Sequence, residues 1–283
     1  MRAKSGLSSR GSGDTPEPLL SLPTPRNHHQ PAMTTLFISD LHLDASRPEI
    51  TAAFERFMTQ VAPGSEALYI LGDFFEVWIG DDDWSDFNQT IINLLKAYSD
   101  SGKALYIMVG NRDFLMGEEF ASQCGATLLN DPTAIDLYGT PTLLMHGDSM
   151  CTKDEEYMAF RQQARSPKWQ QQLLAQPIEA RRAIAKQLRE QSKSMSSMKA
   201  EDIMDVTPEE VIREMTEHQT TRMIHGHTHR PACHQVELGT DVGERIVLGD
   251  WYHYLWWLEA DNQGCIEQHK RPINQENLLE SAR

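Results

Sequence analysis

The stretch Leu36-Phe37-Ile38-Ser39-Asp40-Leu41-His42-Leu43-Asp44 decides the fold. Its first three residues are apolar and predict a short buried strand, and polar side chains follow at once. Asp40 and His42 are two residues apart, so in extended chain both side chains point to the same face. A carboxylate and an imidazole aimed at one point form half of a metal site or a general acid–base pair. Taken alone, the pair also fits a polar strand end that caps a turn.

The same pattern recurs four times downstream, where an apolar segment runs into a polar cluster. The segments and their clusters are 67–71 before Gly72-Asp73, 104–109 before Gly110-Asn111-Arg112-Asp113, 142–145 before His146-Gly147-Asp148, and 221–225 before Gly226-His227-Thr228-His229. Helical patterns lie near 48–61, 86–101 and 114–123, and the last strands are expected at 245–248 and 254–258. Near-continuous apolar strands that alternate with helices predict an α/β protein whose strands are covered on both faces.

All five polar clusters follow the carboxyl ends of expected strands, which is the edge where ligands bind in α/β sheets. Core packing does not explain five strands that each deliver Asp, Asn or His to one edge. Glycines beside the clusters permit tight turns and close backbone approach; they are Gly72, Gly110, Gly147 and Gly226. The sequence therefore predicts a functional site at this edge.

The clusters supply carboxylate, amide and imidazole donors without a thiolate, a set that suits Mn²⁺, Fe²⁺ or Zn²⁺. The candidate ligands are Asp40, His42, Asp73, Asn111, His146, His227 and His229. They are too many for one ion and fit two ions that share a bridging carboxylate. Two metals about 3.5–4 Å apart can hold a bridging hydroxide and clamp a phosphoryl group for in-line displacement.

In this order, the blocks D-x-H, G-D, G-N-R-D, H-G-D and G-H-x-H resemble the calcineurin-like metallophosphoesterase superfamily. The resemblance implies an αββα sandwich with a dinuclear site. By position, it places Asp40, His42, Asp73 and His229 on the first metal, and Asp73 (bridging), Asn111, His146 and His227 on the second.

The residues that flank these blocks show a more specific resemblance. Residues 72–83, 110–115, 146–152 and 224–231 resemble the UDP-2,3-diacylglucosamine pyrophosphatase family of lipid A synthesis in Gram-negative bacteria, over about residues 33–258. The family implies two Mn²⁺ per chain and attack by a bridging hydroxide on the α-phosphate of the UDP moiety. The implied products are UMP and 2,3-diacylglucosamine 1-phosphate, and the implied place is the inner face of the inner membrane, as a cytoplasmic peripheral protein.

The same resemblance implies the residues that act on the substrate. Asp73 and Arg112 are the expected catalytic residues, and the expected substrate contacts are Asn111, Arg112, Asp154, Ser192, Ser196, Lys199 and His227. Arg112 also has a physical argument, because it follows a candidate ligand directly and a guanidinium matches phosphate geometry. Its alternative is a structural salt bridge with an acid such as Asp113.

A long helical region, about 153–218, interrupts the α/β pattern. Between Arg161 and Lys199 we count nine Lys and Arg against Glu179 and Glu190, a local charge of +7 within a chain of −15. An interrupted apolar face accompanies these charges. Such a basic amphipathic segment suits a membrane surface or an anionic lipid headgroup, and the alternative is an ordinary solvated helical hairpin. Beside a phosphoesterase site, we expect a cap that holds acyl chains against its apolar side.

Composition bounds the remaining functions. The chain of 283 residues has a net charge of −15 and a pI of about 5.1, which argues against a general nucleic-acid binder. No apolar run approaches the roughly 20 residues that span a bilayer. We expect a disordered leader at 1–32, one metallophosphoesterase domain at 33–270 and a flexible tail at 271–283. Two local patterns predict helix caps. The acidic run at 81–83 is expected to start a helix, with a cation site as the alternative, and Asp113 is expected to cap a helix that begins at Phe114.

Two other functions stay open at this stage. One is a soluble metal-dependent phosphodiesterase or nucleotide phosphatase on the same scaffold. The other is a scaffold protein that has kept the fold and lost catalysis. The basic cap favours the lipid substrate over the first, and the complete set of candidate ligands counts against the second.

Overall fold

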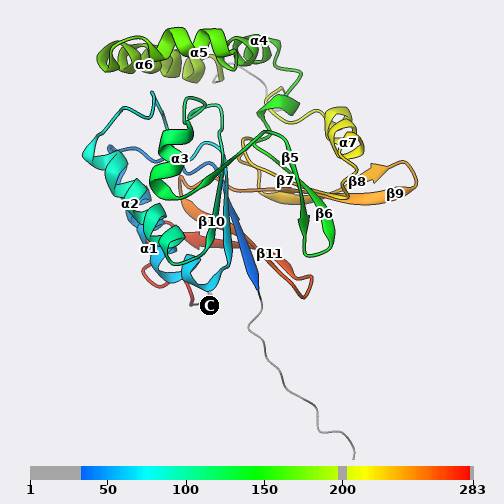
Figure 1. Ribbon diagram of the computed structural model, residues 1–283. Helices are drawn as coiled ribbons and strands as arrows, with labels where there is room; N and C mark the ends of the chain where they lie inside the picture. The colour runs from blue at the N-terminus through cyan, green and yellow to red at the C-terminus, as the bar shows by residue number, and fades with distance from the viewer. Residues whose placement is uncertain (1–32, 197–202, 281–283) are drawn as a thin grey trace, which may run out of the picture. The chain divides into compact units, whose positions relative to one another are not determined.

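The structure is a computed structural model that describes residues 33–196 and 203–280, with only the backbone of residues 193–196. The expected leader at 1–32 lies outside the described residues. Two β-sheets form the centre of the domain (Figure 1). The first contains β1 (Thr34–Ile38), β2 (Ala67–Leu71), β3 (Ala104–Met108), β4 (Thr127–Leu129), β10 (Tyr254–Asp261) and β11 (Ile266–Pro272). The second contains β5 (Thr133–Leu137), β6 (Thr140–Met145), β7 (Arg222–His225), β8 (Ala232–Leu238) and β9 (Asp241–Val247).

The topology brings the ends of the expected strands to one edge. The strand orders are β11-β10-β1-β2-β3-β4 and β5-β6-β7-β9-β8. Strands β1 to β4 are parallel, as are β6, β7 and β9. The two strands expected last in the chain lie in different sheets: β10 pairs antiparallel with β1, whereas β9 pairs parallel with β7.

Alternation along β1 shows why this sequence builds a layered core. Leu36 and Ile38 pack in the cluster beneath the helices, whereas Phe37 packs in a second cluster with Leu144 and Ile224 of the other sheet. Side chains alternate between the faces of a strand, so one apolar run serves both layers. Each such fully buried side chain contributes roughly 1.5–3 kcal/mol.

Helices cover the outer faces of both sheets (Figure 1). Helices α1 (Pro48–Gln60), α2 (Asp86–Asp100) and α3 (Glu118–Cys124) contribute to the core cluster that includes the outer face of the first sheet. Helix α7 (Pro208–Glu217) buries Val211 and Met215 against Leu143 and Met145 of the second sheet. The order of layers is the expected αββα sandwich, and that prediction is confirmed.

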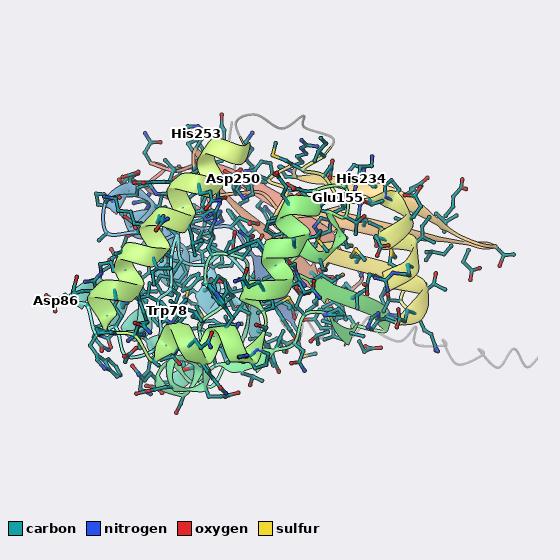
Figure 2. All side chains as sticks on the ribbon, turned by 90° about the horizontal axis from the view of Figure 1, so that it is seen from above. Trp78, Asp86, Glu155, His234, Asp250 and His253 are labelled. Atoms are coloured by element: carbon teal, nitrogen blue, oxygen red, sulfur yellow. The ribbon has the colours of Figure 1, made fainter. Side chains whose placement is uncertain are left out.

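The other three helices form a cap: α4 (Glu155–Ala164), α5 (Pro167–Leu174) and α6 (Ile178–Ser196). Asp154 caps α4 by accepting from the amide of Tyr157 at 3.0 Å, and Ser166 caps α5. Figure 2, viewed from above, shows the three helices laid over the rest of the domain. The expected helical insertion of 153–218 is therefore divided, because its last helix, α7, packs on the sandwich.

Two predictions about helix caps are wrong. Helix α3 begins at Glu118 rather than Phe114, and its N-cap is Gly117. The carboxylate of Asp113 is fully buried and accepts from the amides of Phe74 at 2.8 Å and Gly110 at 2.6 Å, so it fastens the β2 and β3 loops together.

The acidic run at 81–83 also differs from its prediction. Helix α2 is capped by Ser85, whose side chain accepts from the amide of Asn88. Asp81 instead accepts from the amides of Gly117 and Phe120 at the start of α3, both at 3.0 Å. Asp81 thus accepts hydrogen bonds at the N-terminus of a helix that is distant in sequence. Asp82 and Asp83 pair with arginines of helix α6.

The chain packs against the domain beyond residue 270, where the sequence predicts a flexible tail. Strand β11 extends to Pro272, and the amide of Ile273 donates to the carbonyl of His253 at 3.1 Å. Leu278 is only 1% exposed and belongs to the core cluster beneath α1 and α2. Among residues 33–196 and 203–280, no helix is both long and apolar enough to cross a membrane.

Candidate active site

All seven candidate ligands meet at the carboxyl ends of β1, β2, β3, β6 and β7. Six of these residues form two groups, and within each group the potential metal-binding atoms lie within 4.8 Å of one another. The first group is Asp40, His42 and His229, and the second is Asp73, His146 and His227. The strands bring together residues that are 187 positions apart in the chain: the backbone amide of His227 donates to the carboxylate of Asp40 at 3.1 Å.

Asp73 belongs to the second group and also faces the first. Its Oδ2 is 3.9 Å from Nε2 of His42, and its Oδ1 is 3.6 Å from Nε2 of His146. Asn111 completes the second group, because its Oδ1 lies 2.9 Å from both Nε2 of His146 and Nδ1 of His227. These positions are those that a bridging carboxylate and an amide ligand would occupy.

Three candidate ligands, His42, His146 and His229, present Nε2 to the site, and Nδ1 of each ring lies near an oxygen atom that orients the ring. Nδ1 of His146 lies 2.9 Å from the carbonyl oxygen of Leu71, so this nitrogen donates and Nε2 faces the site. Nδ1 of His42 lies 3.1 Å from Oε2 of Glu76. Nδ1 of His229 lies 3.5 Å from Oδ2 of Asp250. Such partners fix the tautomer of metal-binding histidines and raise their basicity.

This orientation leaves ring lone pairs that face one another. Nε2 of His42 and Nε2 of His229 are 3.3 Å apart, and His229 Nε2 is also 3.4 Å from Oδ1 of Asp40. Because Nδ1 of each ring faces a carboxylate, both Nε2 atoms present acceptors to the same point. A cation at that point satisfies all three atoms, so the first group fits a divalent metal.

The backbone is strained where the ligands are held. Five of the seven candidates have φ between 49° and 68°, the left-handed region that side-chain-bearing residues rarely adopt: Asp40, His42, Asp73, His227 and His229. Each such residue costs on the order of 1–3 kcal/mol and persists only when its surroundings hold it there. Strain that is concentrated on these residues indicates a site whose geometry has a function.

The charges of the site are those of a cation-binding centre. Burial alone would raise the pKa of Asp40, but the neighbouring His229 outweighs it and holds this pKa well below its usual range. Burial alone would lower the pKa of His146, yet Asp73 and Asp148 raise it to about 9. Burial lowers the pKa of His227 to about 4, helped by the charge of His146. The buried carboxylates thus attract positive charge into the site, which divalent ions would supply more strongly than protons.

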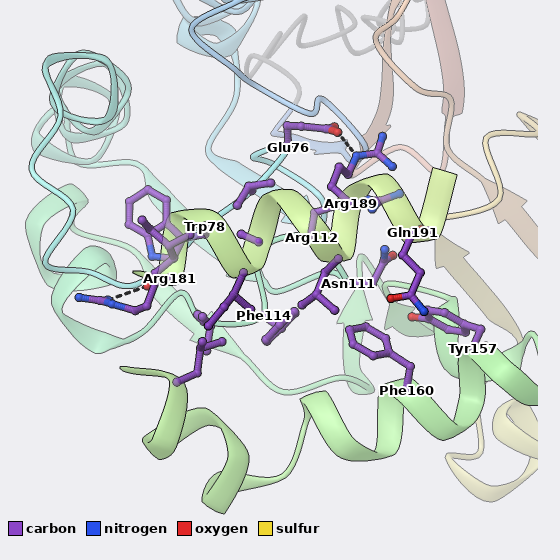
Figure 3. A pocket seen from close by; sticks show the side chains of 18 of the residues that line it. Glu76, Trp78, Asn111, Arg112, Phe114, Tyr157, Phe160, Arg181, Arg189 and Gln191 are labelled. Carbon is purple, nitrogen blue, oxygen red and sulfur yellow. Dashed lines mark hydrogen bonds and ion pairs between the residues drawn. The ribbon is translucent and has the colours of Figure 1, made fainter. Parts of the chain in front are cut away.

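A cavity of about 360 Å³ joins this site to the cap. Figure 3 shows Asn111 and Arg112 near helix α6, with Tyr157 and Phe160 of α4 on the opposite wall. The apolar part of the wall includes Val77, Ile79, Phe114, Leu173, Ile184 and Leu188. One cavity therefore offers a polar end beside the candidate ligands and an apolar end beneath the cap.

The predicted substrate contacts are partly collected in this cavity. Asn111, Arg112, Asp154 and Ser192 line it, whereas His227 stands in the second ligand group. The side chain of Ser196 and the whole of Lys199 lie outside the described residues. Among the described side chains, none accepts from Nε of Arg112, although this atom is buried.

Five arginines of the cap contact the sandwich, which the sequence did not predict. Arg161 pairs with Asp148 at 2.9 Å, and Arg182 pairs with Asp83 at 3.1 Å. Other contacts are Arg165 with the carbonyl of Gly110, Arg181 with Asp82, and Arg189 with Glu76. Much of the local positive charge therefore fastens the cap to the sandwich instead of forming an outward patch.

Sequence reasoning missed Glu76 and Asp250, the acids that orient two candidate ligands. A signal for Asp250 was present, because Leu248-Gly249-Asp250 repeats the triplet Leu71-Gly72-Asp73 just after a strand. Glu76 gave no comparable signal. Burial alone would raise its pKa, but His42 and Arg189 lower it to about 2, so its carboxylate is ionised.

Comparison with known proteins agrees with this geometry. The model of the calcineurin-like phosphoesterase family matches residues 33–231. The chain is a calcineurin-like phosphoesterase. This match confirms the superfamily that the motif order predicted. A metallophosphoesterase domain implies the binding of divalent metal.

Relatives of known name narrow the family to which this phosphoesterase belongs. The UDP-2,3-diacylglucosamine hydrolase of Cellvibrio japonicus is 56% identical over 232 residues, which are 82% of this chain and 97% of the relative. The hydrolase of the same name from Marinobacter nauticus is 53% identical, over 85% of this chain and 99% of the relative. That from Pseudomonas aeruginosa is 52% identical, over 82% and 97%. The phosphoesterase belongs to the family of these hydrolases, and it is an enzyme of the hydrolase class, as predicted.

Proposed function

We propose that this phosphoesterase hydrolyses the pyrophosphate bond of UDP-2,3-diacylglucosamine in lipid A synthesis. The products are UMP and 2,3-diacylglucosamine 1-phosphate. The observation that carries the proposal is a cavity whose wall runs from the candidate ligand Asn111 to an apolar chamber beneath the cap. A substrate with a diphosphate at one end and acyl chains at the other matches both parts. The names of relatives that are 52–56% identical agree with this substrate.

The proposal includes two Mn²⁺ ions per chain. One would be held by Asp40, His42, Asp73 and His229, and the other by Asp73, Asn111, His146 and His227. Oxygen and imidazole donors without a thiolate suit Mn²⁺. When bound, such a pair activates water and neutralises the phosphoryl oxygens in phosphate hydrolysis. We place the attack on the α-phosphate, next to uridine.

The protein side chains bind and orient the diphosphate. Arg112 lines the cavity next to Asn111, and its buried Nε has no acceptor among the described residues, so a phosphate oxygen can serve as one. Charge that develops on the phosphoryl oxygens is then stabilised by a donor already in place. Asp154 and Ser192 line the same cavity, and we propose that they contact the sugar, with Ser196, Lys199 and His227 completing the set.

We propose that the enzyme meets this substrate at the inner face of the inner membrane, as a peripheral protein of the cytoplasm. The support is chemical: two acyl chains hold the substrate in a bilayer, and the apolar chamber can receive them one molecule at a time. Nucleic acid is not a proposed partner, because the chain carries a net charge of −15.

A substrate comparison tests the proposal. Purified protein with Mn²⁺ is given UDP-2,3-diacylglucosamine, UDP-glucose or a small chromogenic phosphodiester, and the products are identified by mass spectrometry. The proposal predicts rapid release of UMP from the lipid nucleotide, none from UDP-glucose and only slow turnover of the small diester, and a chelator abolishes both reactions. Turnover of the small diester without turnover of the lipid nucleotide would favour a soluble phosphodiesterase. No turnover of any substrate together with an empty metal site would favour a scaffold protein.

A further inference from the structure

The carboxylate of Glu76 stands between the cap and a candidate metal ligand. Its Oε2 lies 3.1 Å from Nδ1 of His42 and 3.7 Å from Nη2 of Arg47. Its Oε1 accepts from Nε of Arg189, which belongs to cap helix α6 (Figure 3). Glu76 is largely buried, with 16% of its side chain exposed. One carboxylate thus contacts the cap through one oxygen and a ligand imidazole through the other.

We propose that Glu76 is a positioning residue that couples the seating of the cap to the affinity of the metal site, through Arg189. Nδ1 of His42 and Oε2 of Glu76 lie buried 3.1 Å apart, and neither has a hydrogen-bond partner among the described residues, so each is the group available to the other. Pairing of these two atoms keeps the ring proton on Nδ1 and turns Nε2 toward the first ligand group. The contact with Arg189 fixes the carboxylate in the rotamer that does this. The inference rests on the metal site of the proposed function and is independent of the identity of the substrate.

The other ion pairs of the cap provide the contrast. Arg182 pairs with Asp83 at 3.1 Å, and Arg181 pairs with Asp82. Within the described residues, neither of these carboxylates contacts a candidate ligand, so both pairs only hold the cap in place. The Arg189–Glu76 pair differs because its carboxylate also meets the imidazole of His42.

The coupling acts in both directions, from the cap to the metal site and from the metal site to the cap. If the cap lifts, Arg189 leaves Glu76, the carboxylate gains rotamers, and His42 loses its fixed acceptor, so metal binding weakens. Coupling between two sites is reciprocal in free energy. Metal binding must therefore favour the seated cap by the same factor, and the chamber beneath α6 would be complete only when the metal site is filled.

Metal titration tests the coupling without any substrate. Mn²⁺ is titrated calorimetrically into the metal-free full chain and into Glu76→Gln, Arg189→Met, the double variant and the control Arg182→Met. We expect Glu76→Gln to weaken Mn²⁺ binding by about tenfold or more, and Arg189→Met by about fivefold. Arg189→Met should add nothing in the Glu76→Gln background, and Arg182→Met should stay within about twofold of the unmodified chain. Arg189→Lys, which keeps a donor, should restore part of the affinity.

Three results would overturn the inference. Unchanged Mn²⁺ affinity in Arg189→Met is one, and equal losses in Arg189→Met and Arg182→Met are another, because they would report general loosening of the cap. The third uses the unmodified chain and does not depend on variants that fold: hydrogen exchange at residues 186–192 of α6 should slow on addition of Mn²⁺. No change in that exchange contradicts the coupling, while failure of the chain to cleave the lipid nucleotide would leave these measurements unaffected.

Discussion

The carboxylate of Asp73 accepts a hydrogen bond from the backbone amide of Arg112 at 2.8 Å. This bond joins the loop after β2 to the loop after β3, and it holds Asp73 in the second group of candidate ligands, facing the first. Gly110 makes the contact possible, because a side chain at that position would overlap the carboxylate and the backbone amide of Asp73. The geometry of the metal centre therefore depends on the absence of a single methyl group.

Gly110→Ala should displace Asp73. We expect overpacking of about 1–3 kcal/mol in the free energy of unfolding and a loss of metal affinity of about tenfold or more. Thermal unfolding and Mn²⁺ titration measure the two effects. Gly64→Ala is the matched control, because nothing lies within 4 Å of the position that its added carbon would take. Normal metal binding in Gly110→Ala would show that Asp73 is not held as described.

Asp73→Ala should abolish turnover, with kcat reduced by about three orders of magnitude or more. The reason is that one carboxylate faces both ligand groups, so its loss opens both. Metal content by mass spectrometry and kcat are measured on the same preparation. Asp100→Asn on the exposed end of α2 serves as the control. Retained activity with both metals bound would remove Asp73 from the bridging position.

Arg112→Lys keeps the positive charge and removes the planar fork. We expect kcat/KM to fall by about a hundredfold while Mn²⁺ affinity stays the same, because the side chain meets substrate rather than metal. Steady-state kinetics and metal titration separate these effects. A parallel loss of metal affinity would assign Arg112 to the structure of the β3 loop and not to phosphate binding.

The apolar end of the cavity should decide selectivity for the lipid. Ala185 and Gln187 lie on the same cap helix, but Ala185 lines the cavity and Gln187 is exposed. Ala185→Trp should fill the chamber and lower kcat/KM for UDP-2,3-diacylglucosamine by about tenfold or more, since overpacked space rejects an acyl chain. Turnover of a small chromogenic diester should be spared. Gln187→Trp should change neither, and a similar loss in both variants would place the acyl chains elsewhere.

The sequence predicted the sandwich and the candidate ligands because both depend on local patterns. Apolar strands that end in Asp, Asn or His can be read from neighbouring residues, and parallel strands bring such ends together. The left-handed backbone of Asp40 and Asp73 could not be read in this way. It depends on contacts with other strands.

What the sequence misassigned depends on partners far along the chain. Asp113 has the local surroundings of a helix cap, yet its carboxylate bonds the amide of Phe74, 39 residues away. Arg189 belongs to a segment whose charge suggested an outward face, and its partner Glu76 is 113 residues away. Neither pairing has a periodic signal, so only the folded chain shows where these charges lie.

The most direct test of the account is the bond that is cleaved. UDP-2,3-diacylglucosamine is hydrolysed by the Mn²⁺-loaded enzyme in ¹⁸O-labelled water, and both products are weighed by mass spectrometry. The account predicts one ¹⁸O atom in UMP, none in 2,3-diacylglucosamine 1-phosphate, and no reaction after chelation. Label in the lipid phosphate would contradict attack on the α-phosphate, and no turnover by a metal-loaded enzyme that still hydrolyses a simple diester would contradict the lipid substrate.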